Sequence, residues 1–175
     1  NKNDFFPISD VQPLARGTTL EEPTLDFCKA LYKSDQERDI RRQVQVLSIS
    51  QSTSFFSSEI VKYKSIDAVT EARNELENAI QACKRHLGYQ SSNGLFLSHQ
   101  FIYDTMETDG NNRIRRTIQV ILGGTNDSRV LLASFIFHNE YFLGIYLVRN
   151  GIQTFTSRQL IEFEEMTSLL AKRIT

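Results

Sequence analysis

The sequence predicts an α+β domain: N-terminal helices, then an antiparallel sheet of at least four strands, with a long helix before the sheet and a closing helix after it. Three observations predict this class. Apolar residues recur at helical spacing up to residue 87, alternate with polar residues from residue 94, and return to helical spacing after residue 156. Helices, strands and a helix in this order are typical of α+β domains. We expect the long helix and the closing helix to pack together.

The chain of 175 residues divides into three predicted segments. Residues 1–23 contain all three prolines and no sustained period, so we expect an extended arm or linker. Residues 24–64 are predicted to be helical, because Ser34 to Glu37 (SDQE) matches a capping box that precedes a helical apolar pattern. Residues 65–175 make up the α+β domain.

The strongest helical pattern lies between Ser65, a suitable N-cap, and Gly88, a suitable stop signal. Its apolar side chains form a seam that is wide enough to pack on a sheet or on a second copy of the helix. We assign helix and dimer packing to five residues of this seam: Ile66, Val69, Leu76, Ile80 and Leu87. Arg73 interrupts the seam.

The sheet and the closing helix follow. Alternation predicts strands at 94–103, 114–122, 130–137 and 141–148. The last two strands carry apolar residues on both faces, so we expect them near the centre of the sheet. Thr156 to Gln159 (TSRQ) matches a second capping box, and Phe155 can pack on Leu160.

The strand at 114–122 places apolar and polar residues on opposite faces. A polar face is typical of a solvent-exposed sheet surface. It is also compatible with the wall of a small-molecule pocket, in which Arg115, Thr117 and Gln119 would contact the ligand.

Composition and motifs exclude several classes of function. With 20 Lys+Arg against 21 Asp+Glu, the chain has no basic field that predicts a nucleic-acid partner. No apolar run approaches the ~20 residues of a membrane helix. The three histidines share no metal-ligand spacing, and Arg116 falls where a calcium loop needs its glutamate. No nucleophile and base form a recognisable motif. We therefore predict no catalytic residues, no metal and no cofactor.

The two cysteines, Cys28 and Cys83, lie among apolar residues at helical spacing. Two such residues do not indicate a disulfide scaffold. The sequence favours buried free thiols in a reducing compartment, and hence a cytoplasmic location.

Four pieces of the chain, in this order, resemble a GAF-type sensory domain, in a degenerate GAF/PAS-like form over residues 65–175. They are AVTEARNELENAIQACKRHLGYQSSNGLFLSHQ, SRVLLASFIF, FLGIYLV with Gly144 as the small residue, and FTSRQLIEFEEMTSLLAKRI. The resemblance implies a non-catalytic regulatory module that binds a small molecule or a protein partner. It also implies dimerisation through the first and last helices.

The sequence thus predicts a regulatory and dimerisation domain of a larger signalling or transcription-control protein, acting as a homodimer. Binding would shift the packing between the long helix and the closing helix. Two alternatives stay open. One is a structural assembly subunit whose seam forms a coiled coil without any ligand, and the other is an enzyme whose site is not local in sequence.

Overall fold

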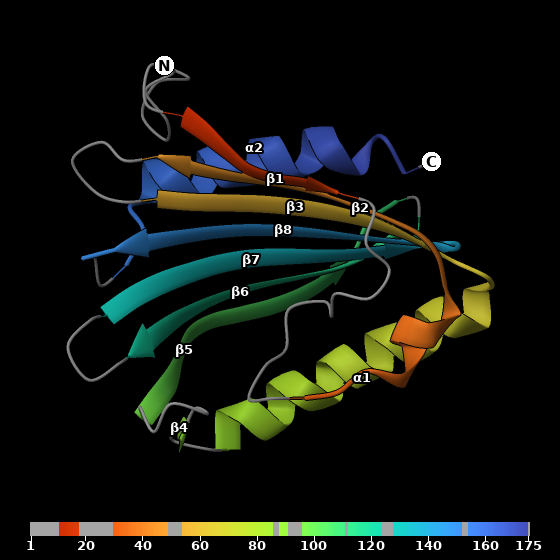
Figure 1. Cartoon of the computed structure of the whole chain (residues 1–175), viewed down its shortest axis with the longest axis horizontal. Coiled ribbons are helices and arrows are strands. Elements are labelled where there is room, and N and C mark those ends of the chain that lie inside the picture. The colour runs from red at the N-terminus through yellow and green to blue at the C-terminus, as the bar shows by residue number, and fades with distance from the viewer. Residues whose placement is uncertain are drawn as a thin grey trace.

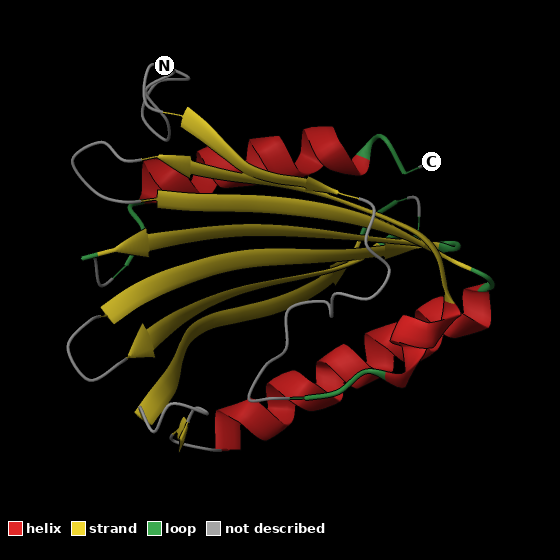
Figure 2. Ribbon diagram, in the orientation of Figure 1, coloured by secondary structure: helices red, strands yellow, loops and turns green. Residues whose placement is uncertain are grey.

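The structure of the chain is a computed structural model. It describes residues 11–17, 30–48, 54–85, 88–90, 96–110, 112–123, 128–151 and 154–174. One antiparallel sheet dominates this part of the chain, with helices at its two sides (Figures 1 and 2). No helix among the described residues is long and apolar enough to cross a membrane.

The sheet has eight strands in the described residues, in the order β1-β2-β3-β8-β7-β6-β5-β4. The strands are β1 (Val11–Gly17), β2 (Arg38–Ser48), β3 (Ser54–Tyr63), β4 (Gly88–Gln90), β5 (Phe96–Thr108), β6 (Ile114–Gly123), β7 (Ser128–His138) and β8 (Tyr141–Asn150). The helices are α1 (Ile66–Arg85), α2 (Ser157–Ala171) and a short 3-10 helix (Lys33–Glu37).

Two apolar cores lie on the two faces of the sheet, because β7 and β8 alternate apolar side chains between the faces. Leu131 and Phe135 of β7 belong to the core under α1, whereas Leu132 and Ile136 belong to the core under α2. These two strands lie at the centre of the sheet, as their two apolar faces predict.

The long helix and the closing helix therefore do not pack together, which corrects the GAF-like arrangement expected from the sequence. The sheet separates α1 from α2 (Figure 1). The physical reason is that each apolar face of the central strands needs its own cover, and one helix is available for each face.

The segment at 24–64 is also not a helical segment, and its described part is mainly strand. Residues 38–48 and 54–63 form β2 and β3, which pair with each other in antiparallel register. Ser34 to Glu37 lie within the short 3-10 helix, whose N-cap is Tyr32 and has no side-chain hydrogen bond, so the predicted capping box does not form. The predicted arm 1–23 contains β1, which pairs with β2. The sheet thus contains strands from all three predicted segments.

The apolar seam of α1 packs within its own chain. Val69, Leu76 and Ile80 are buried in the core against the sheet, so these side chains present no surface to a partner helix. Ile66, at the start of the helix, is 59% exposed. Leu87 lies outside the described residues.

The start of α2 follows its sequence signal. The Gln159 N–H donates to Thr156 Oγ1 at 3.3 Å, and the Thr156 N–H donates to Gln159 Oε1 at 3.0 Å. This reciprocal pair is the predicted capping box. Phe155 and Leu160 both pack in the core under α2.

An ion cluster fixes the C-terminal end of α1 to the edge of the sheet. Asp104 of β5 accepts hydrogen bonds from Arg116 Nε at 2.9 Å and Arg116 Nη2 at 2.8 Å, and it also pairs with Lys84 of α1. Burial alone would raise the pKa of Asp104. The hydrogen bonds from Arg116 and Lys84 outweigh burial and lower this pKa below its usual value of 3.8.

We predict that Asp104→Asn lowers the free energy of unfolding by about 2 kcal/mol at pH 7, since it removes charge-assisted hydrogen bonds. Because the pKa of Asp104 is lower in the folded state, its contribution is present above the unfolded value of 3.8. That contribution disappears as the pH falls through the folded value. Urea unfolding of both proteins from pH 7 to pH 2.5 should therefore show their difference shrinking at acid pH. A constant difference would contradict this account.

Candidate functional site

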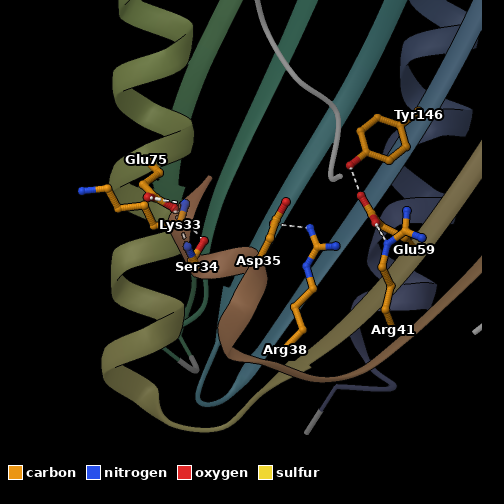
Figure 3. A network of polar contacts seen from close by, with 8 residues as sticks. All are labelled: Lys33, Ser34, Asp35, Arg38, Arg41, Glu59, Glu75 and Tyr146. Carbon is orange, nitrogen blue, oxygen red and sulfur yellow. Dashed lines mark hydrogen bonds and ion pairs between the residues drawn. The ribbon is translucent and has the colours of Figure 1, made fainter. Parts of the chain in front are cut away.

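A network of polar contacts crosses the α1 side of the sheet (Figure 3). It consists of three groups of contacts: Glu75 of α1 with Lys33 and Ser34, Asp35 of the 3-10 helix with Arg38 of β2, and Arg41, Glu59 and Tyr146 on three neighbouring strands. Buried charges are rare in proteins unless they are paired. This network is therefore a candidate functional site.

The centre of the network is a buried triad. Arg41 Nε donates to Glu59 Oε2 at 2.9 Å, and the Tyr146 hydroxyl donates to Glu59 Oε1 at 2.6 Å. Burial and the adjacent Glu59 carboxylate raise the pKa of Tyr146 well above 10.0. Tyr146 is therefore a neutral hydrogen-bond donor, and both oxygens of the Glu59 carboxylate have a donor.

Gly144 makes this triad possible. It lies opposite Glu59 in the register of β3 and β8, and a Cβ at position 144 would lie 2.3 Å from the Tyr146 hydroxyl oxygen. The absence of a side chain lets the Tyr146 ring lie over Gly144 and reach Glu59 on the next strand.

We predict that Gly144→Ala destabilises the protein by about 1–3 kcal/mol, the usual cost of overpacking a core. The Tyr146 ring cannot shift without losing its buried hydrogen bond. Gly110→Ala is the matched control, because a Cβ at Gly110 meets no atom within 4 Å. Thermal unfolding of both variants tests the prediction, and equal melting temperatures would contradict it.

The other half of the network joins α1 to the 3-10 helix. The Lys33 and Ser34 N–H groups donate to the Glu75 carboxylate at 2.8 and 3.1 Å, and the Ser34 hydroxyl donates to it at 2.7 Å. Ser34 therefore bonds to a distant glutamate in place of capping an α-helix. Asp35 pairs with Arg38, whose side chain is completely buried.

Burial shifts two pKa values in this half of the network. Burial raises the pKa of Asp35, and the Arg38 charge only partly opposes that rise. Burial raises the pKa of Tyr63 to about 12. The cavity beside these residues has a volume of ≈ 10 Å³, which is enough for one water molecule. The network is a paired set of charges that holds elements together.

The three predicted ligand residues face α2. Arg115 Nε donates to Ser134 Oγ at 3.2 Å, Thr117 Oγ1 lies 3.4 Å from the same oxygen, and Gln119 Nε2 donates to Thr154 Oγ1 at 3.0 Å. Arg115 also pairs with Glu164 of α2. Their polar groups thus contact the chain's own residues under a helix. None of the three lines a cavity described for this structure.

Two hollows lie along β5, near the edge of the sheet opposite to β1, and residues of α1 line both of them. One hollow of ≈ 670 Å³ is lined by Lys84 and by residues 98–104. A second hollow of ≈ 280 Å³ is lined by Arg73 and Glu77 of α1, by residues 106–108 of β5 and by Ile114. We call these two hollows together the β5 groove.

The exposed edge of β5 forms one wall of this groove. β4 pairs with β5 only at residues 96–98, and no described strand pairs with Tyr103–Thr108 on that side. Large apolar side chains are exposed on this stretch and just before it: Ile102 at 45%, Tyr103 at 45% and Met106 at 62%. Unpaired backbone next to exposed apolar side chains is a template for an added strand.

Cys83 of α1 is completely buried and disulfide-bonded. The chain has two cysteines, and the other is Cys28, which lies outside the described residues. Disulfides persist in oxidising compartments and are rare in the cytosol. The expectations of free thiols and of a cytoplasmic location are therefore wrong.

Comparisons with known proteins add little to this geometry. No family model and no curated protein matches the chain. The chain is similar to the extracellular domain of PknH from Mycobacterium tuberculosis, with 11% identity and a TM-score of 0.49, over 79% of this chain and 75% of that one. That domain is extracellular, unlike the expected cytoplasmic GAF-like transcription regulator. A likeness at this level carries neither a fold nor a function over to this chain.

Proposed function

We propose that the chain is a non-catalytic binding domain that works in an oxidising compartment and binds a protein partner along the exposed edge of β5. A segment of the partner would add to Tyr103–Thr108 as a further strand, next to α1. Main-chain hydrogen bonds would supply affinity, and the side-chain hollows of the β5 groove would supply specificity.

The observation that carries this proposal is the combination of an unpaired edge with a groove beside it. Natural sheets protect their edges with proline, charge or irregular pairing. β1, at the other edge, contains Pro13 and an irregular register between Pro13 and Ala15. On β5 the register is irregular between Phe101 and Tyr103, and the strand continues to Thr108 with Met106 exposed and no described strand beside it.

The unpaired strand edge beside the hollows favours a protein segment over a small molecule as the partner. The cavity beside Ser34 and Asp35 has room for only one water molecule, whereas the two hollows of the β5 groove have volumes of ≈ 670 and ≈ 280 Å³. A concave volume of ~300–1,000 Å³ is typical of small-molecule sites, but such a site does not need an unpaired strand edge. An extended peptide needs an edge and a groove, and both are present here.

The test uses a displayed library of random twelve-residue peptides, selected on the wild-type protein alone and then measured on Met106→Lys. A lysine at the edge should block strand addition. We expect selected peptides to bind the wild type and to lose at least tenfold in affinity on Met106→Lys by fluorescence polarisation. Leu169→Lys is the matched control, because Leu169 is an equally exposed apolar residue on α2.

Peptides that bind all three proteins equally would contradict the proposal, and so would a selection that yields no binder. A second copy of this chain at the same edge is the competing outcome. It would appear in sedimentation as a dimer that Met106→Lys dissociates.

A further inference from the structure

We propose that the β5 groove selects an extended peptide carrying an acidic side chain, and that Arg73 of α1 binds this carboxylate. The inference rests on the proposed function, since it names the chemistry of the peptide that adds to β5. Its argument comes from a different feature of the molecule, namely the one charged residue in the seam of α1.

Arg73 has hydrogen-bonding capacity that the described residues do not use. Its Nε is buried and has no hydrogen-bond partner among the described residues. Its charged partner there is Glu77, with 3.6 Å between Arg73 Nε and Glu77 Oε1, which is too long for a hydrogen bond. A guanidinium has five N–H donors, so Arg73 can keep its contact with Glu77 and still bind a second carboxylate.

Arg73 occupies a position on α1 where an apolar residue would fit the seam. Arg73 interrupts an apolar seam whose neighbours Val69 and Leu76 are buried against the sheet. Its side chain, 27% exposed, lines the smaller hollow of the β5 groove opposite Met106 and Thr108. A leucine at this position would extend the seam, whereas an arginine places a cation beside the unpaired edge.

The other cations beside the groove, Lys84 and Arg116, are paired with an acidic residue of the chain. Lys84 pairs with Asp104 and lies 5.5 Å from the centre of the Phe101 ring. Arg116 is bonded to the same Asp104. The acidic groups at this end are Glu77, which contacts Arg73, and Glu107, which pairs with Arg115 at 3.6 Å. Among the described residues that line the groove, Arg73 is therefore the cation with a donor that has no hydrogen-bond partner.

The strand geometry defines the rest of the peptide. Side chains of an added strand alternate between the two faces of the sheet, so every second one points to the α1 side. When the acidic side chain reaches Arg73, residues two and four positions away lie along the same wall, towards Phe101 and the stem of Lys84. We expect apolar side chains at these two positions.

The experiment takes a peptide that binds the β5 groove and compares it with its Glu→Gln version. Each is titrated by fluorescence polarisation against the wild type, Arg73→Met and Arg73→Lys. We expect Glu→Gln to weaken binding to the wild type roughly tenfold, as expected for one charge-assisted contact. On Arg73→Met the two peptides should bind equally, and Arg73→Lys should restore part of the difference. Melting temperatures of the variants show that they are folded.

The two proposals fail in different ways in this experiment. Peptides that bind the groove and lose affinity on Met106→Lys, but carry no acidic residue that Arg73 distinguishes, would overturn the inference and leave the proposed function standing. Because the lysine introduced at position 106 would also attract an acidic side chain, the Met106→Lys comparison uses the Glu→Gln peptide. A Glu→Gln peptide that is insensitive to Met106→Lys would overturn the proposed function, and the inference with it.

Discussion

Arg41→Met is expected to lower the free energy of unfolding by about 3–5 kcal/mol, because it leaves the Glu59 carboxylate buried without its cation. The Arg41 and Glu59 side chains are almost completely buried, so water cannot replace the lost partner. Tyr146 would still donate to one oxygen of Glu59, but a neutral hydroxyl does not compensate the charge. Urea unfolding followed by circular dichroism measures the loss.

Two further variants show that the loss comes from the broken pair. The double variant Arg41→Met/Glu59→Leu removes both charges and should regain part of the lost stability, because a buried ion pair adds little over an apolar pair. The rest is not regained, since the buried Tyr146 hydroxyl loses its acceptor. Arg42→Met changes an exposed arginine on the opposite face of the same strand, and it should shift stability by less than about 0.5 kcal/mol. Equal losses in the single and double variants would refute this interpretation.

Cys83→Ser is expected to cost about 2–5 kcal/mol, the usual cost of losing a native disulfide. The serine hydroxyl would also be completely buried where the sulfur was. Thermal unfolding with and without dithiothreitol measures the effect in the wild type. The reductant should lower the melting temperature of the wild type and leave that of Cys83→Ser unchanged.

Cys28→Ser separates the bridge from the burial at Cys83. If the two cysteines form the bridge, Cys28→Ser should also lose its response to dithiothreitol, and Cys28→Ser/Cys83→Ser should cost less than the sum of the single variants. Iodoacetamide labelling of the unfolded, unreduced wild type should find no thiol. Two labelled thiols per chain would contradict both the disulfide and the oxidising compartment.

The sequence predicted secondary structure correctly where the spacing of its apolar residues fitted only a helix or only a strand. The α1 pattern from Ile66 onward, the strands with alternating apolar residues and the Thr156 capping box all lie in local sequence. The sequence around Val44 did not decide between helix and strand. Ile40, Val44 and Leu47 fit a helical period, whereas Val44 and Val46 fit a strand period. Pairing with β1 and β3 decides between them, and that pairing is not visible in local sequence.

The candidate site was visible only in part. The sequence showed Arg73 as an interruption of the seam. Its proposed role depends on β5, which comes later in the chain, after β4. The unpaired edge is a property of strand order and leaves no local signal. The cysteines misled the interpretation, since a buried half-cystine and a buried thiol both occupy apolar helical positions. Arg115, Thr117 and Gln119 were placed on one face correctly, but that face is covered by α2.

Amide hydrogen exchange of the protein, alone and with a selected peptide, is the most direct test of the central claim. If a partner strand adds to β5, exchange should slow in Tyr103–Thr108, while the amides of β1 and β2 at the other edge should not change. Protection confined to α2, or to the polar network around Glu59, would contradict the account and move the binding surface away from the β5 groove.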